Sequence, residues 1–66
     1  MPNKEQVRLI FKETYLLYTK YISMEVVDWN LFHKEYADLC IKFPFDLTVS
    51  ILECIVQVIG KQKGGL

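Results

Sequence analysis

The side chains that most often carry chemistry in proteins are scarce in this chain and stand apart from one another. His33 is the only histidine, and Cys40 and Cys54 are the only cysteines. A general base or a metal ligand needs partner groups. In the stretch "LFHKEY" the neighbours of His33 are Lys34 and Glu35, which point elsewhere on a helix. We therefore expect His33 at the rim of a helical core.

The two cysteines and Glu53 also have structural explanations. Cys40 and Cys54 fall on apolar helix faces, where a thiol acts as a small hydrophobic group, whereas a nucleophilic thiol needs an electropositive, partly open site. Glu53 has no second carboxylate near it in sequence. No CxxC spacing occurs, and all three glycines stand at position 60 or later, so no phosphate-binding loop is indicated. We expect no enzyme activity, no cofactor, no metal and no small-molecule substrate.

The composition is that of one small folded domain. The chain has 66 residues, of which 52% are apolar and 24% charged, and its formal net charge is zero. Zero net charge removes the usual electrostatic case for binding nucleic acid or acidic membranes. The start, "MPNKEQVR", lacks the pattern of a secretory signal. With only two cysteines, these features favour a reducing, cytoplasmic location.

Capping residues mark the first two of three expected helices. Asn3 followed by Gln6 reads as a capping box, which predicts a helix over 3–22. Asp28 is a suitable N-cap for a second helix over 28–43, which the proline of "KFPFD" should end.

The third helix is expected over 46–60. Asp46 or Thr48 can cap its start, and Gly60 suits the position just after its end. The remaining "GKQKGGL" residues from 61 to 66 are expected to form a flexible tail after a single helical domain. The sequence therefore predicts a compact all-α three-helix bundle over residues 1–60.

Helical spacing places the apolar residues on faces that should form the core. In the first helix these residues are Val7, Ile10, Phe11, Leu17, Tyr18 and Tyr21. In the second helix they are Trp29, Phe32, Tyr36, Leu39, Cys40 and Phe43. The third helix is apolar over roughly 220° of its circumference and must be covered on two sides. Its apolar run of about 14 residues is shorter than the ~20 that span a membrane, so a bundle position is preferred.

Four apolar residues fall outside the expected core. Leu9 and Leu16 are seven residues apart on the first helix and stack on one face, as in a short coiled-coil seam. Leu31 and Ile41 on the second helix form a weaker pair. Isolated exposed leucines are ordinary. Together with the wide apolar arc of the third helix, however, they favour association with a second copy as a homodimer, or with a larger protein.

Charge patterns suggest both a packing arrangement and an alternative function. Residues 3–22 carry four basic and two acidic side chains, and residues 23–43 carry two basic and four acidic ones, which favours antiparallel neighbours. Lys4, Arg8 and Lys12 form a basic stripe that Tyr15 adjoins, as in some nucleic-acid surfaces. A single arginine and zero net charge disfavour this reading. Protein association is therefore the expected function, with nucleic-acid binding as the alternative.

Overall fold

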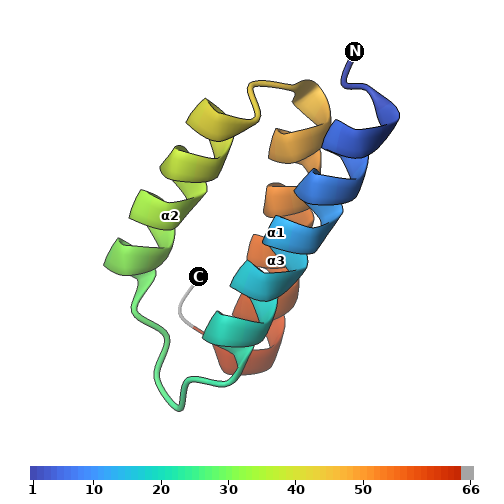
Figure 1. Ribbon diagram of the computed structural model, residues 1–66. Helices are drawn as coiled ribbons and strands as arrows, with labels where there is room; N and C mark the ends of the chain where they lie inside the picture. Colours follow the sequence, from blue (N-terminus) through green and yellow to red (C-terminus); the bar gives the residue numbers. More distant parts are fainter. Residues whose placement is uncertain (65–66) are drawn as a thin grey trace.

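Three α-helices joined by short connections form the computed structural model, which describes residues 1–64. Helix α1 spans Lys4–Ile22, α2 spans Trp29–Lys42 and α3 spans Asp46–Lys63. Figure 1 shows α1 and α3 side by side and running in the same direction, with α2 returning antiparallel beside them. The predicted all-α three-helix bundle is confirmed.

The first two helices begin where their capping residues predict. The Asn3 side chain accepts a hydrogen bond of 2.8 Å from the Gln6 amide, and the Gln6 side chain accepts one of 2.9 Å from the Asn3 amide. The Asp28 side chain accepts a bond of 3.1 Å from the Leu31 amide. Both helix starts are therefore fixed by side chains that satisfy otherwise free backbone amides.

The start of α3 differs from the prediction. Phe45 occupies the N-cap position, where no side chain caps the helix. Asp46 is the first helical residue, and its carboxylate lies near the positive end of the helix dipole. Thr48 lies within the first turn of the helix, fully buried, and its hydroxyl has no hydrogen-bond partner within residues 1–64. The helix begins early enough to take both predicted caps into its first turn.

The end of α3 also differs, by one turn. Gly60 lies inside the helix, which continues through Lys63 and ends at Gly64. Gly64 has a φ of 77°, a conformation that favours glycine, and its amide donates a 2.8 Å bond to the Gly60 carbonyl. A glycine within a helix costs only about 1 kcal/mol. The expected tail therefore starts later, and its residues 65–66 lie outside the described range.

The core is centred on Phe32, whose ring no solvent reaches. Its ring makes edge-on contacts with Tyr21 and Trp29, at centroid distances of 5.0 and 5.4 Å. The buried residues are Ile10, Thr14, Leu17, Tyr21, Phe32, Phe43, Thr48, Leu52 and Ile59. Phe11, expected in this core, is instead 53% exposed, because the buried side of α1 is centred on Ile10, Thr14 and Leu17.

Helices α1 and α2 are antiparallel and joined by opposite charges. Lys20 pairs with Glu35 at 2.6 Å, and Glu13 pairs with Lys42 at 3.5 Å. The earlier residue of α1 meets the later residue of α2, as antiparallel helices require. Exposed pairs of this kind contribute at most about 1 kcal/mol each to the free energy of unfolding. Their main effect is therefore on the register in which α1 and α2 pack.

Helix α3 contributes its apolar side chains to the core. Its residues Leu52 and Ile59 are fully buried, and Ile55 and Val56 pack against the same core.

No helix within residues 1–64 has the combination of length and hydropathy that crossing a membrane would require.

Candidate functional site

An open apolar groove of about 490 Å³ runs between α1 and α3. Its lining from α1 is Phe11, Thr14, Tyr15 and Tyr18. Its lining from α3 is Ser50, Ile51, Cys54, Ile55 and Val58. The spacings of three and four residues within each set place each set on one helix face. The groove therefore follows from two parallel helices that each keep an apolar strip outside the core.

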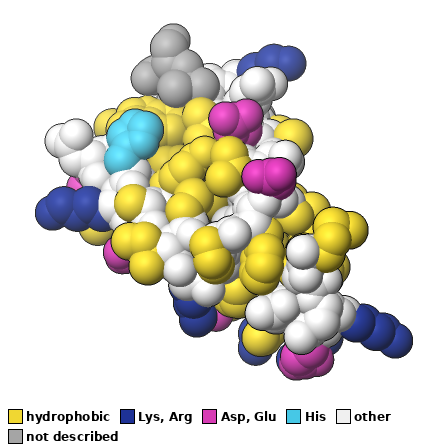
Figure 2. Space-filling model, turned by 90° about the horizontal axis from the view of Figure 1, so that it is seen from above, with side chains coloured by type: hydrophobic (Ala, Val, Ile, Leu, Met, Phe, Trp, Pro, Cys, Tyr) yellow, Lys and Arg dark blue, Asp and Glu magenta, His cyan; other side chains and the backbone are white. Residues whose placement is uncertain are grey.

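Large side chains in this groove are exposed to solvent. Tyr15 is 64% exposed, Phe11 is 53% exposed and Val58 is 40% exposed. The Tyr15 and Tyr18 rings lie 6.4 Å apart in a tilted arrangement. The space-filling view from above shows more broadly that hydrophobic side chains reach the surface, with lysine and arginine side chains extending at the periphery (Figure 2). Single exposed apolar residues are ordinary, but several lining one groove indicate an interaction surface.

Helical spacing places basic side chains beside the groove, outside its lining residues. Lys4 and Arg8 share the groove side of α1 with Phe11. Lys12 follows Arg8 by four residues and lies further around the helix from Phe11. Lys61 follows Val58 by three residues, on the same side at the end of α3. Lys4, Lys12 and Lys61 form no ion pair within the described residues 1–64.

Carboxylates near the groove are engaged or face elsewhere. Glu5 pairs with Arg8 at 2.5 Å, and this contact lowers the pKa of Glu5. Burial raises the pKa of Tyr36 on α2, with smaller contributions from Cys40 and from the charge of Glu53. Glu53 is exposed and does not line the groove; it stands one position before Cys54, about 100° around the helix. The rim of the groove is consequently basic.

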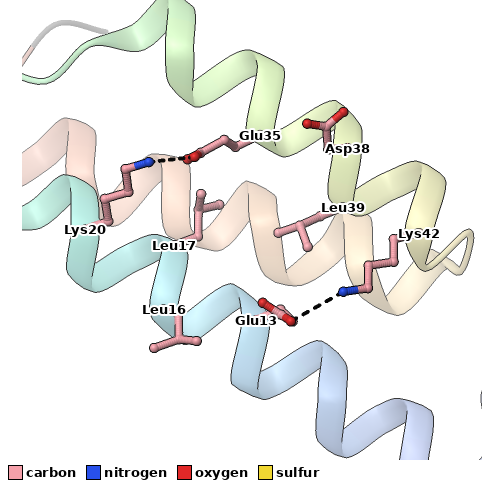
Figure 3. Close-up of a pocket in the computed structure, with 8 residues that line it drawn as sticks. All are labelled: Glu13, Leu16, Leu17, Lys20, Glu35, Asp38, Leu39 and Lys42. Atoms are coloured by element: carbon pink, nitrogen blue, oxygen red, sulfur yellow. Dashed lines mark hydrogen bonds and ion pairs between the residues drawn. The ribbon is translucent and has the colours of Figure 1, made fainter.

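A second hollow, of about 360 Å³, lies between α1 and α2 and is lined with charge. Figure 3 shows Leu17 and Leu39 between the two helices, flanked by the Lys20–Glu35 and Glu13–Lys42 pairs. Glu35 also accepts a hydrogen bond of 2.6 Å from the Tyr21 hydroxyl. With each carboxylate oxygen engaged by a donor, this side chain has a structural role in joining α1 to α2.

The protonation of this cluster follows from its contacts. Burial acts to raise the pKa of Glu35, but the hydrogen bonds from Lys20 and Tyr21 and the charge of Lys20 outweigh it, so the pKa lies below 4.5. Burial and then the contact with Glu35 raise the pKa of Tyr21. At neutral pH Glu35 is ionised and Tyr21 is a neutral hydrogen-bond donor, the two states that their bond requires.

The four apolar residues predicted as a partner interface lie in different settings. Leu9 is partly buried, whereas Leu16 is 50% exposed at the edge of the charged hollow and projects away from α2 (Figure 3). Leu31 is 37% exposed and Ile41 is 78% exposed on α2. Ten residues of helix, about 15 Å, separate these two. The role of all four in association stays a prediction.

The other predicted residues are found as follows. Lys4, Arg8 and Lys12 are exposed on α1, where the Arg8–Glu5 pair interrupts the stripe. His33 is exposed, with its ring 6.2 Å from that of Phe32. Within residues 1–64 no three His, Cys, Asp or Glu side chains gather as metal ligands would.

The two cysteines differ in setting. Cys40 is partly buried against the core. Cys54, expected to be packed, is exposed and lines the groove between α1 and α3.

Sequence patterns did not identify the groove itself. Phe11 and Tyr18 were expected in the core, and Tyr15 was considered only for stacking on a nucleic-acid base. The signal that pointed to the groove is the apolar arc of α3, which is wider than two neighbouring helices can cover. Ile51 and Val58 belong to the uncovered part of that arc.

Comparison with protein-family models, curated proteins and solved structures finds no match to this chain.

Proposed function

We propose that this chain is a protein-association module whose docking surface is the apolar groove between α1 and α3. The observation that supports the proposal is the exposure of Phe11, Tyr15 and Val58 along one groove. Burying such side chains against a partner removes apolar area from water, at roughly 25 cal/mol per Å² before the costs of association. Aromatic side chains are also enriched at the energetic centres of protein interfaces.

The proposal covers a larger protein or a second copy of this chain as the partner, and it places both in the cytoplasm. The location is proposed because Cys40 and Cys54 are free thiols, as is usual in reducing compartments. A module of this kind needs no catalytic group and no cofactor.

Nucleic-acid binding through Lys4, Arg8 and Lys12 is the alternative. Tyr15 next to this stripe is exposed enough to stack on a base. Arg8, however, is paired with Glu5, which removes part of the charge that a phosphate would meet. The groove beside the stripe is also almost wholly apolar, which suits a protein partner better.

Site-specific photocrosslinking in the source cells tests the proposal. Tyr15 is replaced by benzoyl-phenylalanine, a photoreactive residue of similar shape, and Val26 is replaced in a matched control. Val26 is 84% exposed in the connection between α1 and α2, outside the groove. We expect a discrete protein adduct, identified by mass spectrometry, from position 15 and none from position 26.

The two other outcomes have clear meanings. Equal adducts from positions 15 and 26 would contradict a docking surface in the groove. An adduct at position 15 that nuclease treatment removes would replace the proposal with the nucleic-acid alternative. The photoreactive variants should keep the circular dichroism spectrum of the natural chain, since both positions are exposed.

A further inference from the structure

We infer that the groove between α1 and α3 accepts an amphipathic α-helix of another protein, one that carries acidic residues beside its apolar face. This inference rests on the proposed function and specifies its partner. It is drawn from the shape of the groove, the apolar character of its floor and the charge of its rim.

The shape of the groove suits a helix. Two neighbouring parallel helices leave a furrow along their length, and a third helix fills such a furrow with side chains at positions i, i+3, i+4 and i+7. The lining runs over 11–18 of α1 and 50–58 of α3, so about 10 Å of helix is apolar on both walls. A partner with three or four apolar residues on one face would match this length.

The charge of the rim selects an acidic partner. By helical spacing, Lys4 and Lys12 lie beside the α1 wall and Lys61 lies just beyond the end of the α3 wall, all three outside the groove lining. None of the three is neutralised by a carboxylate within residues 1–64. Complementary charges around an apolar contact steer association and fix its register. Aspartate or glutamate flanking the apolar face of the partner would meet these lysines at the rim.

A second copy of this chain fits less well in the same place. If the groove of one copy covered the groove of another, the basic rims of both would meet without opposing carboxylates. Glu53, the acid of α3 nearest the groove lining in sequence, is not itself a lining residue and stands about 100° around the helix from Cys54. Like charges brought together at an interface oppose association, so a helix of opposite charge is the better occupant.

Fluorescence anisotropy with two labelled peptides tests the inference. Both are 18-residue designed helices with leucine on one face. One carries glutamate on the flanks of that face, and its matched partner carries lysine at the same positions. We expect the glutamate peptide to bind, to bind more weakly as salt is raised, and to exceed the lysine peptide in affinity by at least about tenfold.

Three variants locate the binding. The double variant K4E/K12E should weaken the glutamate peptide by about tenfold and improve the lysine peptide. Val58→Glu, at a 40% exposed position in the groove, should abolish binding of both peptides. Val26→Glu, at an 84% exposed position in the connection between α1 and α2, should bind as the natural chain does. Circular dichroism melting of each variant establishes that it is folded.

Several results would overturn the inference. These are absence of binding by the glutamate peptide, equal binding of both peptides, or binding that Val58→Glu leaves unchanged. A dimer by light scattering that Val58→Glu dissociates would show that a second copy occupies the groove. In each case, a protein adduct from position 15 would still support the proposed association function, so the failure of the two proposals can be told apart.

Discussion

The carboxylate of Glu35 accepts hydrogen bonds from two different residues of α1. Its two oxygens accept hydrogen bonds of 2.6 Å from Lys20 and from Tyr21, one from the surface and one from the edge of the core. A carboxylate engaged in this way is held in its ionised form. Glu35 therefore links the stability of the α1–α2 pairing to pH.

Acid should weaken the fold through Glu35. The folded pKa of this group lies below its unfolded value near 4.5, so its contribution is present above pH 4.5 and is lost as the pH falls through the folded pKa. We expect Glu35→Gln to lower the free energy of unfolding at pH 7 and to flatten its decline below pH 4.5. Urea unfolding at several pH values measures both effects. An unchanged slope in the variant would contradict this assignment.

At the residue scale, sequence patterns predicted local contacts and missed distant ones. The Asn3–Gln6 capping box and the Asp28 cap join residues three positions apart, so spacing alone was sufficient to find them. The Tyr21–Glu35 bond joins residues on different helices. The sequence supplied opposite charges on the two helices but not the register that brings these two side chains together.

At the scale of elements, the three helices begin in different ways. α1 and α2 start at side chains that accept backbone hydrogen bonds, whereas α3 starts at Phe45 with no such cap. The acidic first residue Asp46 and the buried face of the helix support α3 instead. Tertiary packing therefore does for α3 what capping does for the other two.

The cap of α2 should have a measurable effect on stability. Replacing Asp28 by alanine removes the acceptor of the Leu31 amide, and we expect a loss of about 1 kcal/mol in the free energy of unfolding. Asp38→Ala is the matched control, because Asp38 is an exposed aspartate within α2 whose side chain makes no hydrogen bond within residues 1–64. Chemical unfolding of both variants gives the comparison. Equal losses would show that the cap adds nothing beyond charge.

The bounds of the elements were predictable where a strong stop signal exists. The proline of "KFPFD" ended the second helix as expected, since the residue before proline avoids helical geometry. Gly60 was a weaker signal, because a glycine can end a helix or be carried within one at small cost. The end at Gly64 depends on its left-handed conformation, which the sequence permits at several glycines.

At the scale of the whole molecule, the bundle has two different sides. α2 covers one side of the α1–α3 pair, and the opposite side keeps the apolar groove with its basic rim. A helical wheel gives the width of an apolar face but not which neighbour covers which part of it. For this reason the fold was predictable from the sequence. The existence of surplus apolar surface was also predictable, but its position between α1 and α3 was not.

The uneven burial of the three helices has a consequence for motion. Within its own span α2 buries only Phe32, whereas α1 buries four residues and α3 buries three. Amide hydrogens in α2 should therefore exchange with deuterated water faster than those in the middle of α1 and α3, as NMR can measure for each residue. Equal exchange in all three helices would instead indicate a single opening unit. With unequal exchange, α2 separates and recloses while α1 and α3 stay together, which briefly uncovers a second apolar surface on the same pair.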